Sequence, residues 1–416
     1  MRTVGLITEY NPFHNGHLHH LRQSKRLADA EVAVAVMSGH FLQRGEPALV
    51  DKWTRTRMAL AAGVDVVVEL PFPWACNSAP QFADGAVAVL EALGGIDALC
   101  FGSESGELES LQGCARVLQE QDTLIATRTA EQLKTGTTYP AAREQVVREI
   151  AGDQVDAGLL ATPNNILGIE YFRALERTAS GIQPLTLPRI GAGFHDLEGF
   201  GEIASATGIR RMLAAGEGVG EYLPEPCGTL LADALVSGES LDSEILHRLL
   251  VAAILRDAEQ LATIYQVDNG LENRLIEAAL ASRDFDELVD KVKSRQLTRT
   301  RIQRILTYVL LGIQRDEMQQ ALAVGPRYLH LLGCSERGQR YLAASRKWRS
   351  LPLIQNFSRV RSTLKRHYGP ETTAYLKAIA QLKFQEHATL SYQLLLQRAS
   401  AANRNADYFT DLITSS

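Results

Sequence analysis

The residues of this chain whose types and spacing best suit a reaction are two histidines, His14 and His17, with Gly16 between them. They follow a short apolar run at residues 4–7 and a polar loop that holds Asn11 and Asn15. An apolar run that ends in a polar turn and opens into a helix places the turn at the carboxyl edge of a parallel sheet, where α/β proteins bind ligands. We therefore expect a ligand site at this turn.

This spacing is typical of a site for a triphosphate. Gly16 removes a side chain where a phosphate would approach the backbone, and a helix that starts near it offers free N–H groups and the positive end of its dipole. His14 and His17 are three residues apart, so both can reach the same anion from one side of the turn. We expect the two imidazoles to donate hydrogen bonds to the charge that builds up as pyrophosphate leaves.

Two other interpretations of these histidines remain open. His14, His17, His19 and His20 could bind a metal ion, but no carboxylate or cysteine in the same turn completes a coordination shell, so we expect no metal site. They could also be ordinary surface histidines on an N-terminal helix.

The elements that would hold this turn are those of an α/β protein. Apolar runs predict strands at residues 31–37, 64–70, 98–101 and 183–187, with helices between them. Strands and helices in alternation indicate a doubly wound parallel sheet. From residue 233 onward the pattern is almost wholly helical, and the glycine-rich stretch at 215–220 is the best boundary. We expect an α/β domain over residues 1–215 and a mainly α-helical domain over 216–416.

Other loops place further polar residues near the same edge of the sheet. The loop at residues 38–50 is too polar to be core, and Gln43, Arg44 and Lys52 could meet a carboxylate or phosphates there; a solvated loop is the alternative. Gly102 follows a strand and would lie beside the base or ribose of a nucleotide.

Two more polar positions follow further along the chain. Asn164 or Asn165 could cap the helix that comes next, or its amide could hydrogen-bond a ligand. Arg189 stands at the end of a strand, where a guanidinium could pair with a phosphate.

Residues 203–211 contain a second set of candidates for binding phosphate. Ser205 and Thr207 place hydroxyl groups at the start of a helix, and Arg210 follows one turn later. Simple capping of the helix by Ser205 or Thr207 is the competing interpretation.

Charge is unevenly distributed along the chain. The 416 residues have a net charge of −5, but residues 291–366 hold seventeen Lys and Arg against three acids, an excess of fourteen positive charges. Such a segment suggests a polyanionic partner, although solvated helix faces can also be basic.

Composition also bounds the compartment. Five scattered cysteines without paired spacing are expected to be reduced thiols. No apolar stretch approaches the roughly 20 residues that span a bilayer, and the chain begins with a strand instead of a signal segment. We therefore expect a cytoplasmic protein that does not enter a membrane.

Together these residues resemble the nucleotidyltransferase superfamily whose signature is HxGH, shared with class I aminoacyl-tRNA synthetases. Residues 203–210 resemble its second, ISSTxxR-like signature, except that Ala204 stands at the first serine. EYNPFHNGH at residues 9–17, MSGHFLQRGEPALV at 37–50, PNNILGIEY at 163–171 and a basic helix at 298–312 are similar to the bacterial tRNA(Met) cytidine acetate ligases.

This resemblance implies an ATP-dependent, AMP-forming ligase. It would activate acetate as acetyl-adenylate and acetylate N4 of the wobble cytidine of elongator tRNA(Met), giving N4-acetylcytidine, AMP and pyrophosphate. Magnesium would accompany ATP through its phosphates.

The resemblance also assigns residues to roles. The catalytic residues would be His14, His17, Ser205, Thr207 and Arg210. The ATP contacts would be Ile7, Thr8, Glu9, Tyr10, Asn11, Pro12, Phe13, His14, Asn15, Gly16, His17, Leu18, His19, His20, Gly102, Asn164, Asn165 and Arg189. The contacts with tRNA phosphates would be Lys291, Lys293, Arg295, Arg299, Arg301 and Arg304.

Two other functions stay open on sequence alone. An adenylyltransferase that acts on a small phosphorylated metabolite would use the same N-terminal motifs, but it does not need a strongly basic helical segment. A non-catalytic RNA-binding protein would need the basic segment, but not intact His14, Gly16 and His17.

Overall fold

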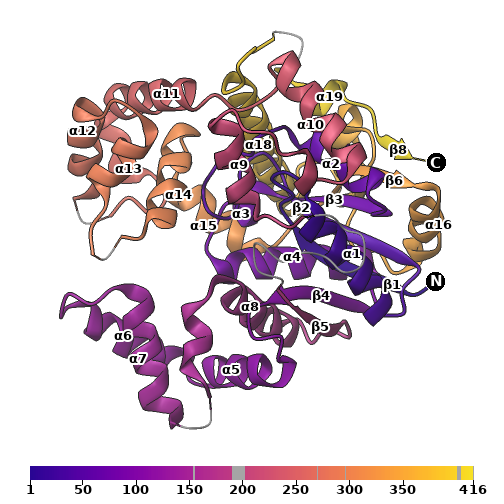
Figure 1. The fold of residues 1–416 in the computed structure, drawn as a ribbon, viewed down its shortest axis with the longest axis horizontal. Coiled ribbons are helices and arrows are strands. Elements are labelled where there is room, and N and C mark those ends of the chain that lie inside the picture. The colour runs from indigo at the N-terminus through magenta and orange to yellow at the C-terminus, as the bar shows by residue number, and fades with distance from the viewer. Residues whose placement is uncertain (153–154, 190–201, 269, 296, 401–403, 416) are drawn as a thin grey trace.

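The computed structural model describes residues 1–152, 155–189, 202–268, 270–295, 297–400 and 404–415, and in these ranges the chain builds one eight-stranded sheet (Figure 1). The strand order is β5-β4-β1-β2-β3-β6-β7, with β8 beside β6. The strands are β1 (Thr3–Thr8), β2 (Val32–Ser38), β3 (Val66–Leu70), β4 (Ala98–Ser103), β5 (Gln183–Pro188), β6 (Leu329–Ser335), β7 (Leu353–Ile354) and β8 (Ile413–Ser415).

The first five strands form the doubly wound sheet that the sequence predicts. They pair in parallel, and β1 lies between β2 and β4. The chain builds outward from β1 through β2 to β3 and then returns to the other side of β1 for β4 and β5. The order therefore reverses between β1 and β4, and a ligand crevice is expected at the carboxyl ends of these two strands.

Helices cover both faces of the sheet because its strands are apolar on both sides. In β2, Val34 and Val36 pack into a core with α4, whereas Ala33 and Ala35 pack into another core with α1 and α2. The helices that connect the parallel strands are α1 (Asn15–Leu27), α2 (Lys52–Ala61), α3 (Phe72–Ala75), α4 (Ala79–Leu93), α5 (Leu108–Glu120), α6 (Asp122–Leu133), α7 (Tyr139–Ala151) and α8 (Pro163–Arg177).

The rest of the chain is mainly helical, as predicted. Its helices are α9 (Ala206–Ala214), α10 (Glu225–Ser237), α11 (Ser243–Arg256), α12 (Leu271–Ala281), α13 (Phe285–Val292), α14 (Arg299–Leu310), α15 (Arg315–Val324), α16 (Glu336–Ala344), α17 (Val360–Tyr368), α18 (Thr373–Leu394) and α19 (Ala406–Phe409). None of the helices in the described ranges has the length and apolar character that crossing a membrane requires.

The structure differs from the expected division at residue 215 in one respect. The later strands β6, β7 and β8 return to the sheet, and β6 pairs antiparallel with β3. The short run LHLLGCS of β6 is almost fully buried, and periodicity alone does not distinguish such a run from a buried helical turn. The sheet therefore contains residues from both sides of the predicted boundary.

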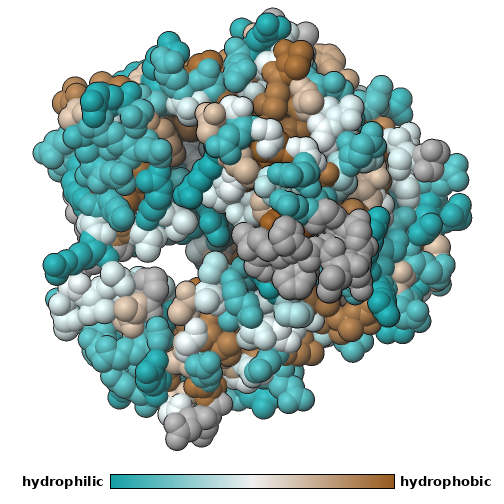
Figure 2. Space-filling view, viewed as in Figure 1, coloured by the Kyte–Doolittle hydropathy of each residue, from teal (hydrophilic) through white to brown (hydrophobic). Residues whose placement is uncertain are grey.

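Two groups of helices project from the sheet on either side of an open space. Helices α5–α7 form one group and helices α11–α14 the other (Figure 1). The molecule is hollowed between them (Figure 2). This arrangement brings α14 and α7 to opposite sides of the same depression.

Candidate functional site

A cavity of about 1390 Å³ lies where β1 and β4 end. Its walls come from the start of α1, the loop at residues 38–50, α8, α9 and α14. All five residues predicted to be catalytic line it, namely His14, His17, Ser205, Thr207 and Arg210. The predicted ATP contacts that also line it are Ile7, Thr8, Glu9, Tyr10, Asn11, His14, Gly16, His17, His19, His20, Gly102, Asn164 and Arg189.

Five predicted ATP contacts, Pro12, Phe13, Asn15, Leu18 and Asn165, lie outside the cavity lining. Phe13 and Leu18 pack in the core beneath the turn. Asn165 is buried, and its Oδ1 accepts hydrogen bonds from the backbone N–H groups of the two residues after Ser103, at 2.9 and 3.1 Å. In the structure Phe13, Leu18 and Asn165 support the walls.

Asn15 joins the two predicted phosphate-binding segments. Its Nδ2 donates to the backbone carbonyls of Glu202 and Glu221, at 3.0 and 2.8 Å, and these residues flank α9. A buried amide between two segments fixes both of them, because leaving its polar atoms without partners is costly. Asn15 therefore places α9 against the histidine turn.

The two signature histidines are stacked. Their ring centroids are 3.7 Å apart at an interplanar angle of 27°. The backbone N–H of His14 donates to Nδ1 of His17 at 3.2 Å. An Nδ1 that accepts leaves the proton of a neutral imidazole on Nε2, so the hydrogen-bond network assigns His17 an Nε2–H donor.

The surroundings of both rings disfavour the charged form of the imidazole. Burial, reinforced by the nearby Arg189 guanidinium, lowers the pKa of His14 to about 3. Burial also holds the pKa of His17 well below its usual range, with further contributions from His14, His20 and Arg189. Two charges 3.7 Å apart would repel by about 4.5 kcal/mol at an effective dielectric constant of 20, so the pair does not charge fully. The histidines are therefore N–H donors in a cationic surrounding, which suits a polyanionic ligand.

The absence of a side chain at Gly16 leaves room for the ring of His14 as well as for a phosphate. A Cβ at this position would lie 2.9 Å from Cε1 of His14. Gly102 similarly leaves room for Arg189, whose Cγ would lie 3.2 Å from an added Cβ. Arg189 in turn donates from Nη1 to Oδ1 of Asn164 at 2.8 Å, so the guanidinium is held beside the end of β4.

In the second signature the capping interpretation is confirmed for Ser205, which also lies at the cavity. Ser205 caps α9, since its Oγ accepts from the N–H of Gly208 at 3.1 Å, and it also lines the cavity. Arg210 donates from Nη1 to the carbonyl of Asn11 at 2.9 Å and pairs with Glu46 at 3.0 Å. These contacts bring the guanidinium to the histidine turn.

The loop at residues 38–50 divides the roles proposed for Gln43, Arg44 and Lys52. Gln43 and Arg44 line the cavity. Lys52 does not reach a ligand: it is fully buried and pairs with Glu69 at 2.7 Å and Asp407 at 2.5 Å. The expectation that Lys52 meets a ligand is therefore wrong, and so is the alternative of a solvated side chain: Lys52 joins β3 to the C-terminal helix α19.

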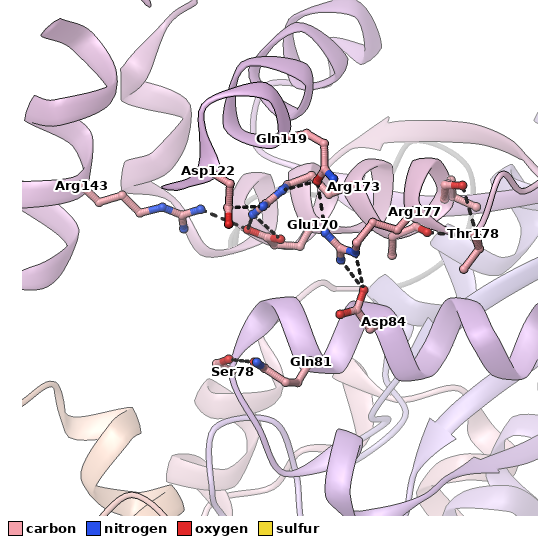
Figure 3. A network of polar contacts seen from close by, with 12 residues as sticks. Ser78, Gln81, Asp84, Gln119, Asp122, Arg143, Glu170, Arg173, Arg177 and Thr178 are labelled. Carbon is pink, nitrogen blue, oxygen red and sulfur yellow. Dashed lines mark hydrogen bonds and ion pairs between the residues drawn. The ribbon is translucent and has the colours of Figure 1, made fainter. Parts of the chain in front are cut away.

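The wall on the side of α5–α8 is held by a network of ion pairs (Figure 3). Nη1 of Arg173 donates to both carboxylate oxygens of the buried Glu170 at 3.1 Å, and Arg143 of α7 reaches the same carboxylate at 3.2 Å. Arg173 also pairs with Asp122 at the start of α6, at 2.5 Å. Arg143, Asp122 and Arg173 line the cavity. The network therefore holds helices α6 and α7 in place as one side of the cavity.

The residues predicted to bind RNA differ in how exposed their side chains are and in the contacts that they make within the protein. Lys293 and Arg295 are exposed, and Arg301 lines the cavity. The other three make contacts within the protein: the exposed Lys291 pairs with Glu287 one turn away, and Arg299 pairs with Asp286 and Asp290. The largely buried Arg304 also lines the cavity, and it donates to the carbonyl of Gln43.

Another part of the basic segment lies elsewhere. Arg337 of α16 donates to the carbonyl of Glu31, just before β2, and this places α16 at the amino edge of the parallel strands. In Figure 1, α16 and α14 lie on opposite sides of the molecule. The seventeen basic residues thus do not form one surface, because β6 carries the chain across the sheet between them.

Carboxylates at the cavity are already used by the protein. Oε1 of Glu9 accepts from the N–H of Gln43, Glu46 pairs with Arg210, and Glu104 accepts from Asn164 and Asn165. Elsewhere in the described residues Glu69, His330 and Asp407 lie close enough to share an ion, but the ammonium of Lys52 occupies the centre of that group. The donor set does not fit a dedicated magnesium site, so magnesium would depend on the phosphates of ATP.

Comparisons with known proteins agree with this geometry. A model of the HIGH nucleotidyl transferase family matches residues 1–407. The chain is 57% identical over 98% of both chains to a tRNA(Met) cytidine acetate ligase of Syntrophotalea carbinolica, and 43% identical to one of Lysinibacillus sphaericus over 85% of this chain and 89% of the relative.

Solved structures give the same result. A crystal structure of Thermotoga maritima TmcAL bound with alpha-thio ATP superposes with a TM-score of 0.89 at 32% identity, over 100% of this chain and 99% of the other. The apo form of the same protein gives a TM-score of 0.90 with the same coverage. The chain therefore belongs to the HIGH nucleotidyl transferase family and, within it, to the tRNA(Met) cytidine acetate ligases.

Proposed function

We propose that this protein uses ATP to activate acetate as acetyl-adenylate and then acetylates N4 of the wobble cytidine in elongator tRNA(Met). The observation that supports this most directly is the cavity itself, where the stacked His14 and His17 and the fixed Arg210 face one space at the switch point of the sheet. The near full-length identity to named tRNA(Met) cytidine acetate ligases supports the choice of substrate.

The first step joins acetate to the α-phosphate of ATP. A carboxylate oxygen of acetate forms a bond to phosphorus, and the bond from the α-phosphorus to the bridging oxygen breaks, which releases pyrophosphate. In this step His17 Nε2–H and the guanidiniums of Arg189 and Arg210 stabilise the charge that develops on pyrophosphate. Thr207 adds a hydroxyl group, and Gly16 in the first turn of α1 brings the positive end of that helix dipole to the same cavity.

The second step needs the mixed anhydride because the exocyclic amine of cytidine is a weak nucleophile. The amine attacks the acetyl carbonyl, AMP leaves, and the amine loses one proton. The cytidine has to leave the anticodon stack to reach the cavity, which costs little in a single-stranded loop. The exposed Lys293 and Arg295, together with Arg301 in the cavity lining, would hold RNA phosphates.

Incubation with ATP, labelled acetate and total bacterial tRNA, followed by nucleoside analysis, tests this proposal. We expect label in N4-acetylcytidine and release of AMP and pyrophosphate in equal amounts. Adenylation of a small metabolite without any dependence on tRNA would refute the proposal and favour an adenylyltransferase. Both substrates occur in the cytoplasm, which is where we place this activity.

A further inference from the structure

Glu46 is an unexpected residue to find in a cavity for a triphosphate. Its carboxylate lines the same cavity as His14 and His17. A negative charge there opposes the binding of an anion, so Glu46 can favour ATP binding or the reaction only through another group. The group it touches is Arg210, at 3.0 Å from Nη2 to Oε2.

The orientation of Arg210 depends on two contacts. Nη1 donates to the carbonyl of Asn11 at 2.9 Å, and Nη2 donates to Glu46. A guanidinium is planar, so fixing two of its nitrogens sets the direction of the remaining N–H groups. Without Glu46 the side chain would keep a single anchor at Asn11 and could rotate about it.

Glu46 is itself fixed by α14. Nε2 of Gln303, which is 4% exposed, donates to Oε1 of Glu46 at 3.2 Å, so each carboxylate oxygen has its own partner. The neighbouring loop backbone is tied to the same helix, because Thr307 Oγ1 donates to the carbonyl of Gly45 at 2.8 Å. Gly45 adopts φ +81°, and an added Cβ would lie 2.2 Å from the backbone nitrogen of Arg304. The loop therefore rests directly on α14.

Resting on the function proposed above, we propose that Glu46 is a positioning residue for adenylation: it aims Arg210 at the phosphates, and Gln303 holds Glu46 in place. The relay Gln303–Glu46–Arg210 connects α14, which also presents Arg301 to the cavity, with the nucleotide site. It assigns α14 a part in the first reaction in addition to its proposed contact with RNA.

A double-mutant cycle in acetate-dependent ATP–pyrophosphate exchange tests the relay. We expect Glu46→Ala to lower kcat about tenfold to hundredfold, since misplacing a catalytic group by about 1 Å has effects of that size. Arg210→Ala should lower kcat at least as far, and the double variant should match Arg210→Ala within about twofold, because Glu46 acts only through Arg210. Multiplicative losses would overturn the proposal.

Two further variants separate orientation from charge and from folding. Glu46→Gln keeps an oxygen acceptor for Arg210, and the amide of Gln303 can rotate to meet it, so its kcat should lie closer to that of the unmodified protein than to that of Glu46→Ala. A loss equal to that of Glu46→Ala would contradict positioning by an acceptor. Gln303→Leu, which cuts the relay one step earlier, should lower kcat in the same direction; an unchanged kcat would remove α14 from the relay.

Controls make the outcome specific. Glu217→Ala removes an exposed carboxylate just beyond α9 and should leave kcat unchanged. Thermal midpoints measured for every variant identify losses that come from unfolding. If the unmodified protein shows no exchange with acetate, the proposed function fails; if it does and Glu46→Ala matches it, only the positioning role fails.

Discussion

His17→Ala should abolish most adenylation while leaving the affinity for tRNA nearly unchanged. Nδ1 of His17 accepts the backbone N–H of His14, so the Nε2–H of His17 is oriented by the protein before any ligand binds. Donors organised in this way contribute most where charge develops during the reaction. Its ring also packs 5.0 Å from that of Tyr10, centroid to centroid, so truncation removes local packing as well.

The expected magnitude follows from the loss of one such donor. Removing a single preorganised donor to a developing anion lowers kcat about 10²- to 10³-fold, or roughly 2.7–4 kcal/mol in activation free energy. Arg189 and Arg210 remain, so the loss should not exceed this range by much. The affinity for tRNA should change little, because Lys293, Arg295 and Arg301 are untouched.

Two conservative variants separate the donor from the packing. His17→Asn can keep the acceptor for the His14 N–H but lacks a donor at the position of Nε2, so it should be as slow as His17→Ala. His17→Gln can place an N–H near that position and should recover part of the rate. His387→Ala, an exposed histidine on α18, is the matched control.

Acetate-dependent ATP–pyrophosphate exchange measures the rate, and filter binding measures the dissociation constant for tRNA. A His17→Asn variant with the unmodified rate would show that the Nε2–H donor is not used. Parallel loss of exchange and tRNA affinity in His17→Ala would refute the separation of the two sites.

Three other perturbations follow from the structure. Lys52→Met should lower the free energy of unfolding in urea by about 3–5 kcal/mol, because it removes the ammonium between two buried carboxylates and leaves Glu69 with only its contacts to His330 and Gln385. A change below about 1 kcal/mol would show that these carboxylates are hydrated or protonated. Burial holds the pKa of His14 at about 3 and of His20 at about 4, so below pH 6.5 the unfolded chain binds protons that the folded chain does not. As the pH falls from 6.5 to 5, each of these histidines should therefore lower the free energy of unfolding by up to about 1.4 kcal/mol per pH unit. Burial raises the pKa of Glu9, so this carboxyl group acts in the opposite direction. A urea midpoint that does not change over this pH range would contradict the burial of the two histidines as neutral groups. Replacing Lys293 and Arg301 by Ala should weaken tRNA binding and reduce the slope of log affinity against log salt by about two, and an unchanged slope would remove both from the RNA surface.

Much of the fold follows from local sequence patterns. The parallel strands have apolar runs bounded by turn residues, and all five appear where the sequence predicts them. The later strand β6 cannot be recognised from the sequence, because its seven residues lie within a helical context and its partner, β3, is more than 250 residues away. Strand pairing over such a distance leaves no periodic signal near either segment.

The sequence predicts those residues of the candidate site whose side chains line the cavity. The signature residues identify the turn, and spacing alone indicates which side chains point to one anion. The roles of Asn15, Asn165 and Lys52 could not be read in this way, because each depends on a partner distant in sequence. A polar residue near a motif looks the same in sequence whether it binds the ligand or supports the residue that does.

Glu46 and Arg304 extend this reasoning to charge. Counting basic residues places Arg304 with the RNA contacts, whereas its guanidinium lies 3.2 Å from the carbonyl of Gln43 and its side chain is largely buried. By its charge alone, Glu46 would not be expected to take part in binding ATP. It nevertheless anchors Arg210, which lines the cavity. In both cases the contact, and not the sign of the charge, determines the role. Because both residues link the loop at 38–50 to α9 or α14, this loop connects the two helices across the wall of the cavity.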